Sequence, residues 1–130
     1  MNYDVIIIGA GVSGSAVARE LSRFRGKIAV FEKEMDLCEG TTKANSGICH
    51  SGFDAKTGTL KARLNVEGNQ MMEQLSKDLD FPFIRNGSLV VALKGDSMEQ
   101  LVQLQKQGTK NDVQGLEVLT REQVREMEPH

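Results

Sequence analysis

The pattern of apolar and polar residues at the start of the chain predicts a strand, a helix and a second strand. Residues 3–8 form a run of mostly β-branched apolar side chains that ends abruptly in a glycine-rich turn. Apolar residues then recur at helical spacing over residues 12–24, and residues 28–31 form a second short apolar run. Because parallel strands joined by a helix cross over right-handed, we expect a β-α-β unit here.

A long polar loop separates this unit from the next predicted element. The loop covers about twenty residues, which is long for a compact domain and therefore suggests a function. A helix is then expected to begin at Thr57 or Thr59, either of which could cap it, and to end near residue 79. Its apolar residues are expected to share one buried face; they are Leu60, Leu64, Met71, Met72, Leu75 and Leu79.

The last fifty residues predict antiparallel strands and two more helices. Asn86-Gly87 separates the apolar runs 81–85 and 88–93, and this pair favours a type I′ hairpin turn. Asp96 or Ser97 is expected to cap a helix that stops at Gly108. Residues 116–119 are expected to form a short strand, and the spacing of residues 120–123 matches a capping box that opens a final helix.

Composition and charge restrict the class of protein. The 130 residues suffice for one domain, or part of one, and the formal net charge of −2 gives no reason to expect nucleic acid as a partner. The longest apolar run is far shorter than the roughly 20 residues of a membrane span, and no signal peptide is evident, so we expect a cytoplasmic protein. Cys38 and Cys49 are expected to be ordinary thiols, and no metal site is predicted.

The glycine turn has the spacing of a dinucleotide-binding motif, Gly9-x-Gly11-x-x-Gly14. The first glycine permits the tight turn, the second lets the backbone approach a pyrophosphate, and the third lets the helix pack closely on the strand. Glu32 ends the second strand about twenty residues later, where a carboxylate can accept hydrogen bonds from the ribose hydroxyls of an adenosine. The alternative is a tight strand-to-helix turn with an exposed carboxylate. The motif by itself fits NAD and FAD equally.

The loop that follows Glu32 resembles a signature of one flavoprotein superfamily. The stretch GTTKANSGICHSG, residues 40–52, is similar to the FAD-dependent amine and hydroxy-acid oxidoreductases of the D-amino-acid oxidase superfamily, and the resemblance extends over the whole chain. It implies that the loop returns to the cofactor and lines its pyrophosphate and flavin ring. The residues then expected to bind FAD are Gly9, Gly11, Val12, Ser13, Gly14, Glu32, Lys33, Thr41, Thr42, Asn45, Ser46 and Gly47.

His50 is the one candidate catalytic residue. The resemblance implies a place beside the flavin, as a donor to the ring, as a partner of the reacting hydroxyl, or as a covalent attachment point in some relatives. The alternative is a loop histidine whose hydrogen bonds are satisfied by backbone, because the sequence shows no partner that would make it a base.

Within the superfamily, residues 45–72 look most like the flavin glycerol-3-phosphate dehydrogenases of the anaerobic type, and the L-2-hydroxyglutarate oxidases share the stretch N-S-G-x-x-H-x-G. The resemblance implies oxidation of a secondary alcohol on a small-molecule substrate, with glycerol 3-phosphate the first candidate. L-2-hydroxyglutarate, another 2-hydroxy acid or an amino acid is the alternative. Electrons would pass to a quinone or another redox carrier.

The resemblance also implies an α/β fold: a Rossmann-like FAD-binding β-α-β unit followed by the start of an antiparallel-sheet α+β substrate domain. We expect residues 1–80 to belong to the first domain and 81–130 to the second. On this view the chain is an amino-terminal fragment, inactive alone, whose parent forms an oligomer and associates peripherally with a membrane in some settings. The alternative from outside the enzymes is a module that binds a dinucleotide without catalysing a reaction. An NAD-dependent dehydrogenase is a further alternative, which the sequence of the polar loop favours less.

Overall fold

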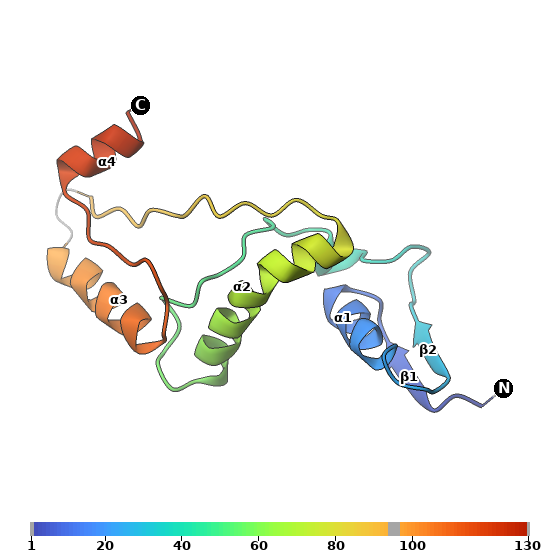
Figure 1. Ribbon diagram of the computed structural model, residues 1–130. Helices are drawn as coiled ribbons and strands as arrows, with labels where there is room; N and C mark the ends of the chain where they lie inside the picture. The colour runs from blue at the N-terminus through green and yellow to red at the C-terminus, as the bar shows by residue number, and fades with distance from the viewer. Residues whose placement is uncertain (1, 94–96, 130) are drawn as a thin grey trace. The chain divides into compact units, whose positions relative to one another are not determined.

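The computed structural model describes residues 2–93 and 97–129, which form two compact units, Met1–Ile48 and Cys49–His130. The elements in chain order are β1 (Val5–Ile8), α1 (Val12–Leu21), β2 (Ile28–Phe31), a single 3-10 turn η1 (Gly40–Thr42), α2 (Leu60–Leu79), α3 (Met98–Lys110) and α4 (Arg121–Met127) (Figure 1). The domain boundary expected between residues 80 and 81 stays a prediction.

The first unit is the predicted β-α-β unit. Strands β1 and β2 pair in parallel, with Val5 opposite Ile28 and Ile8 opposite Phe31, and α1 packs against both strands (Figure 1). Ile7 is buried at 9% exposure, whereas Ile8 is 89% exposed. This alternation is the period of a strand with one covered face. The β-α-β prediction is therefore confirmed.

The second unit opens with a turn segment and the long helix α2. Thr59 caps α2, because its hydroxyl accepts a hydrogen bond from the Ala62 N–H at 3.3 Å. The helix ends at Leu79, and Asp80 adopts the left-handed conformation, with φ 52°, that terminates many helices. Of the two predicted caps, Thr59 is confirmed. No helix within residues 2–93 and 97–129 is long and apolar enough to cross a membrane.

The face of α2 that is buried differs from the predicted one. Four residues of the predicted face are between 50% and 62% exposed, namely Leu60, Leu64, Met71 and Leu79, and the other two, Met72 and Leu75, are half-buried. The small residue Ala62 is instead buried at 4%. Gly52, with φ +96°, lies so close to α2 that a Cβ atom there would be 3.1 Å from the Val66 side chain. A glycine segment can approach a helix most closely over small side chains, and so the face with Ala62 is covered.

Residues 52–55 are enclosed by the end of α3 as well as by α2. The Asn111 amide donates hydrogen bonds to the carbonyl oxygens of Gly52, at 2.9 Å, and Ala55, at 2.7 Å. Asn111 is 8% exposed and Ala55 is 2% exposed. These two bonds join parts of the chain that are more than fifty residues apart in sequence, and they form the polar centre of the second unit.

We expect Asn111→Ala to lower the free energy of unfolding of the second unit by about 1–3 kcal/mol, because it leaves the buried Ala55 carbonyl without a donor and removes one of the two donors to the Gly52 carbonyl. Urea unfolding followed by circular dichroism measures this loss. The matched control is Gln70→Ala, an exposed amide on α2, for which we expect a change below about 0.5 kcal/mol. Equal losses in the two variants would contradict the role of Asn111.

The predicted helix stop at Gly108 is wrong. Helix α3 begins after Ser97, whose hydroxyl caps it as predicted, and continues through Gly108 to Lys110. Gly108 is buried because a Cβ atom there would lie 2.4 Å from Leu116 and 2.9 Å from the Cβ of Phe53. The glycine therefore makes room for packing inside the helix. The other predicted cap, Asp96, lies outside the described residues.

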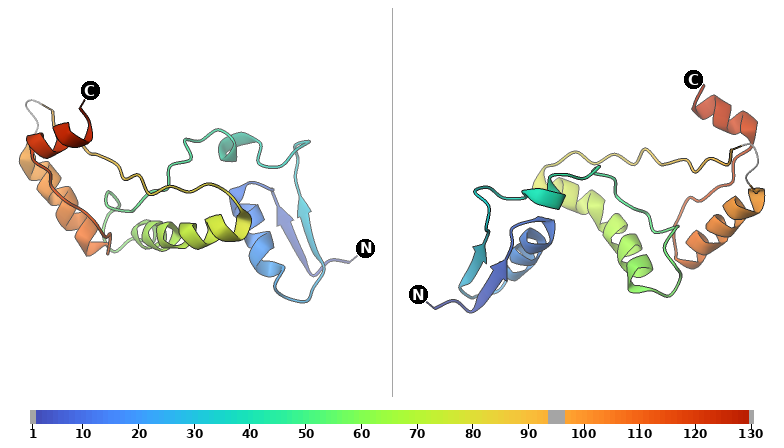
Figure 2. Two further views of the ribbon diagram at one scale, coloured as in Figure 1. Left: turned by 45° about the horizontal axis from the view of Figure 1, so that its top comes forward. Right: turned by 180° about the vertical axis from the view of Figure 1, so that it is seen from behind.

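The predicted strands after α2 are also corrected. Residues 81–93 and 116–119 are extended but belong to no sheet, as the yellow and orange segments of Figures 1 and 2 show. A type I′ turn needs positive φ at both central residues, and only Gly87, with φ +73°, has it. The start of this segment is instead fastened to α2 through side chains, with Ser76 donating to the Phe81 carbonyl at 2.6 Å. The antiparallel part of the expected fold thus has no paired strand among the described residues.

The final helix confirms the predicted capping box. The Thr120 hydroxyl accepts from the Gln123 N–H at 3.3 Å, and the Gln123 side chain accepts from the Thr120 N–H at 2.8 Å. Two of the N–H groups that lack intrahelical partners at the helix start, those of Thr120 and Gln123, are thereby satisfied. Helix α4 is therefore fixed by local sequence alone.

Candidate functional site

The glycine turn between β1 and α1 has the geometry that its spacing predicts. Gly9 has φ +94°, a conformation that strongly favours glycine. A Cβ atom on Gly14 would lie only 1.9 Å from the Gly9 carbonyl oxygen and 3.4 Å from Ile7. The first glycine makes the turn and the third allows α1 to pack directly on the strand end.

The polar loop returns to the amino terminus of α1. Thr42, the last residue of η1, accepts a hydrogen bond on Oγ1 from the Val12 N–H at 3.1 Å. A Cβ atom on Gly11 would come within 2.9 Å of the same Thr42 oxygen. The second glycine therefore lets the loop hydroxyl reach the helix end, where backbone N–H groups and the helix dipole favour an oxygen acceptor.

Cys38 in the loop and Ser15 in α1, which the sequence analysis did not assign to the site, both contact the carbonyl group of Ala10 in the turn. The Ala10 carbonyl accepts hydrogen bonds from the Cys38 N–H at 3.2 Å and the Ser15 hydroxyl at 3.4 Å, and the Cys38 thiol lies 3.5 Å from it. Cys38 has φ +62°, which is uncommon for a residue with a side chain. Nothing in the composition of this stretch marks Cys38, because its role depends on a backbone conformation.

Glu32 connects the end of β2 to the same turn. Its Oε2 accepts from the Ala10 N–H at 2.7 Å, and its Oε1 accepts from the N–H groups of Lys33 and Glu34 at 2.8 and 3.1 Å. The bond from Ala10 is the largest cause of a lowered pKa of Glu32, followed by the bond from Glu34. Two carboxylate oxygens offer about four acceptor positions, and so a further donor can still be accommodated.

Because the folded pKa of Glu32 lies below its ordinary value of 4.5, its ionised form stabilises the fold at neutral pH, and this stabilisation is lost as the pH falls below about 4.5. We expect Glu32→Gln to be less stable than the wild type at pH 7 and to lose less stability between pH 7 and pH 3.5. Thermal unfolding at the two pH values measures the difference. Glu34→Gln, which changes an exposed carboxylate two residues further along the chain, is the control and should keep the wild-type dependence on pH.

The remaining predicted site residues of the first unit are exposed, and several bond within their own loop. The Asn45 amide donates to the carbonyl oxygens of Thr41 and Thr42, while its Oδ1 accepts from the Gly47 N–H at 2.8 Å. The Lys33 ammonium pairs with Glu34 at 3.1 Å. Asn45 thus shapes the loop in this structure. Thr41, Ser46 and the helix-opening residues Val12 and Ser13 are exposed.

His50 belongs to the second unit. Its residue is exposed, and its carbonyl oxygen accepts a hydrogen bond from the Asn69 amide at 3.4 Å. The same amide lies 3.6 Å from the Cys49 sulfur. Among residues 2–93 and 97–129, no group of three or more histidine, cysteine, aspartate or glutamate residues could hold a metal ion.

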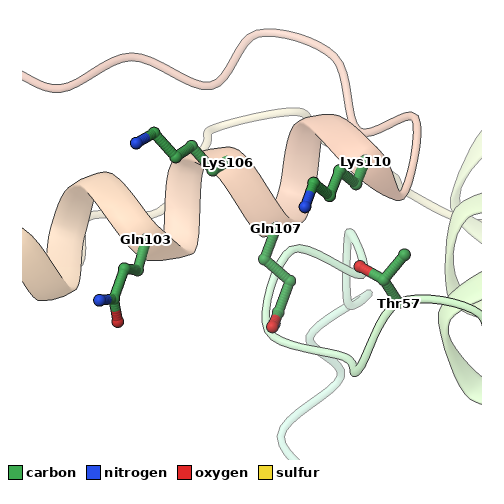
Figure 3. Close-up of a pocket in the computed structure, with 5 residues that line it drawn as sticks. All are labelled: Thr57, Gln103, Lys106, Gln107 and Lys110. Carbon is green, nitrogen blue, oxygen red and sulfur yellow. The ribbon is translucent and has the colours of Figure 1, made fainter.

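A separate cleft of about 340 Å³ lies beside α3 in the second unit. Figure 3 shows Gln107 pointing toward the segment that carries Thr57, with Gln103, Lys106 and Lys110 along the same helix. The cleft includes none of the residues that the sequence analysis assigned to a site. Its exposed lysines and amides are also what an ordinary helix surface presents to solvent.

Residues 4–130 match the sequence profile of the family described as FAD dependent oxidoreductase. The chain belongs to this family. The resemblance inferred from the glycine motif and the polar loop is thereby confirmed, as are the flavoprotein class and the Rossmann-like start of the fold.

Individual proteins of known function are also similar to this chain. The chain is 51% identical over 128 residues to a glycerol 3-phosphate dehydrogenase of Caloramator mitchellensis, covering 98% of this chain and 27% of that protein. It is 36% identical to the mitochondrial L-2-hydroxyglutarate dehydrogenase of Nematostella vectensis, covering 99% of this chain and 29% of that protein. The dithionite-reduced L-α-glycerophosphate oxidase of Mycoplasma pneumoniae, solved with FAD bound, matches with a TM-score of 0.87 at 34% identity, covering 99% of this chain and 35% of that one. The chain therefore spans about a quarter to a third of the length of these relatives.

The geometry of the turn between β1 and α1 fits the pyrophosphate of FAD. The positions of Gly11 and Gly14 leave no room for a Cβ atom, so the backbone itself forms the surface of the turn. The amino terminus of α1 leaves the N–H groups of Ser13 and Gly14 without intrahelical partners. Exposed backbone donors at a helix start are what a phosphate binds.

Proposed function

We propose that the protein containing this chain binds FAD at the β1–α1 turn and oxidises a secondary alcohol, with glycerol 3-phosphate as the substrate. The observation that carries the proposal is the contact between the glycine turn and the polar loop, in which Thr42 reaches the N–H of Val12. The similarity to a glycerol 3-phosphate dehydrogenase and to an L-α-glycerophosphate oxidase supports the choice of substrate.

In this proposal the first unit holds the cofactor. Gly9, Gly11 and Gly14 let the backbone approach the pyrophosphate, and the N–H groups of Ser13 and Gly14 face its oxygens, while the Val12 N–H stays bonded to Thr42. Thr41, Thr42, Asn45, Ser46, Gly47 and Lys33 supply further donors from the loop and strand end. Three backbone N–H groups bond to the Glu32 carboxylate, which leaves one of its roughly four acceptor positions for a hydroxyl group of the ribose.

The second unit supplies His50. When bound, FAD provides the two-electron redox chemistry that protein side chains lack. A ring nitrogen of His50 takes the proton of the substrate hydroxyl, and the residues around it hold the substrate in the reactive orientation. We also propose a quinone or another redox carrier as the electron acceptor. A cytoplasmic location, an oligomer and peripheral membrane association stay predictions.

A second candidate substrate is L-2-hydroxyglutarate, which the similarity to the Nematostella vectensis enzyme favours. Both candidates are small anionic secondary alcohols, so the same proton transfer at His50 serves either. An amino-acid substrate and a non-catalytic dinucleotide-binding module are the remaining alternatives, and the same experiment separates them from the alcohols.

The test uses the full-length protein under anaerobic conditions. Flavin absorbance is followed while glycerol 3-phosphate, L-2-hydroxyglutarate and an L-amino-acid mixture are added in separate titrations. We expect glycerol 3-phosphate to bleach the flavin band in a stoichiometric titration. Bleaching by L-2-hydroxyglutarate alone would favour the second candidate, bound flavin that no compound reduces would favour the binding module, and a colourless protein that takes up no FAD would contradict the proposal.

A further inference from the structure

One amide on α2 contacts the segment that carries His50. Asn69 lies in the middle of α2, and its Nδ2 is 3.4 Å from the His50 carbonyl oxygen and 3.6 Å from the Cys49 sulfur. A carbonyl oxygen only accepts hydrogen bonds, so the amino side of the Asn69 amide must face the segment. These contacts join Cys49 and His50 to a rigid helix.

Arg85 determines which way this amide points. Its NH1 donates to the Asn69 Oδ1 at 2.8 Å, and its NH2 donates to the Asn69 backbone oxygen at 3.1 Å. A guanidinium has only donors, so the oxygen of the amide must face Arg85 and the amino group must face the opposite side. The two neighbours of Asn69 therefore demand the same orientation of one side chain.

Arg85 is itself held in place from two further directions. Its Nε donates to Glu73, which follows Asn69 by one turn on the same face of α2. This bond lowers the pKa of Glu73 and keeps its carboxylate charged. The guanidinium also lies over the Phe83 ring, 5.3 Å from its centre. A planar fork with this many fixed contacts can hold an amide that a flexible lysine would not.

We infer that Asn69, oriented by Arg85, is a positioning residue that fixes the Cys49–His50 segment for catalysis. The inference rests on the proposed function, in that it assigns to His50 a role in proton transfer. Neither residue carries a motif: the two are sixteen positions apart, one on a helix and the other on an extended segment, and only the fold brings them together.

The decisive variant is Asn69→Asp in the full-length holoenzyme. Aspartate keeps an oxygen acceptor for Arg85 but removes the donor to the His50 carbonyl. The bond between Arg85 and α2 therefore remains, whereas the bond between α2 and the Cys49–His50 segment is lost. The matched control is Gln70→Glu, which makes the same change of charge at the next, exposed residue of α2. Arg85→Lys is a second variant, which keeps the positive charge but lacks the planar guanidinium that donates two hydrogen bonds to Asn69.

Two readouts separate positioning from stability. The first is the alkylation rate of Cys49 by iodoacetamide, measured by peptide mapping with Cys38 as the internal reference. The thiolate is the reacting form, and a carboxylate beside the sulfur disfavours it, so we expect a rate roughly 3–10-fold lower in Asn69→Asp. The second is turnover of glycerol 3-phosphate, for which we expect kcat to fall about tenfold in Asn69→Asp and Arg85→Lys with KM changed less than about twofold.

The inference is supported if Asn69→Asp shows both the slower alkylation of Cys49 and the lower kcat, and Gln70→Glu shows neither. Unchanged Cys49 alkylation in Asn69→Asp, an unchanged kcat, or a kcat loss shared by Gln70→Glu would each overturn it. If Asn69→Asp fails to fold, the same two measurements on Arg85→Lys decide. If the wild-type holoenzyme is reduced by neither candidate substrate, the proposed function fails, and the alkylation rate of Cys49 alone then decides whether Asn69 holds the segment.

Discussion

Gly14→Ala is expected to abolish FAD binding by this protein. The added Cβ would lie 1.9 Å from the Gly9 carbonyl oxygen, and neither atom belongs to a flexible side chain. To remove this clash, α1 must move away from the end of β1, which displaces the backbone donors that we propose bind the pyrophosphate. We expect the dissociation constant of FAD to rise by about 100-fold or more, measured by quenching of flavin fluorescence on the apoprotein.

The control for this variant is Gly68→Ala. Gly68 lies inside α2, and a Cβ atom there meets nothing within 4 Å. Alanine is the better helix former, so this change is expected to leave FAD affinity unchanged and to stabilise the protein by about 1 kcal/mol. FAD affinity in Gly14→Ala within threefold of the wild type would show that the turn does not contact the cofactor.

His50→Asn is expected to lower kcat by roughly 100-fold to 10,000-fold, the range associated with loss of a general acid or base. Asparagine retains a polar side chain of similar length but cannot take a proton at neutral pH. His50 is exposed in the second unit, and the Asn69 bond uses its backbone oxygen, so the substitution keeps this bond. Anaerobic single-turnover reduction of the bound flavin by glycerol 3-phosphate measures the effect directly.

FAD affinity and thermal stability of the same variant serve as controls and are expected to match the wild type. A rate of flavin reduction within fivefold of the wild type would remove His50 from the chemistry and leave the cofactor site untouched. Loss of flavin together with loss of activity would instead indicate that His50 helps to hold the cofactor.

The first unit could be predicted from sequence because its determinants are local. The order of apolar run, glycine turn and helical periodicity specifies a β-α-β unit whatever the rest of the chain does. The loop's resemblance then predicted the family. The contacts inside the loop could not be predicted in this way. The bond from Cys38 to Ala10, for example, depends on the positive φ of Cys38, which the spacing of residue types along the sequence does not indicate.

The second unit was predicted less well because its determinants are distant in sequence. Asn86-Gly87 favours a hairpin locally, but a strand needs a paired neighbour, and the residues before this turn bond to α2 instead. Gly108 carries the usual signal of a helix end, and yet it lies inside α3 because Phe53 and Leu116 occupy the space beside it. The Asn69–Arg85 pair could be found only after the extended segment had been placed against the helix.

The hydrogen bond from Asn111 to Gly52 has a consequence for how the second unit forms. Its partners are 59 residues apart, so a long stretch of chain must be brought together before the bond contributes anything. During synthesis, residues 52–55 leave the ribosome well before their donor does, and their carbonyl groups stay hydrated until Asn111 arrives. Assembly of this unit is therefore expected to be late and cooperative, with α2 able to form first and the turn segment docking only in a final step.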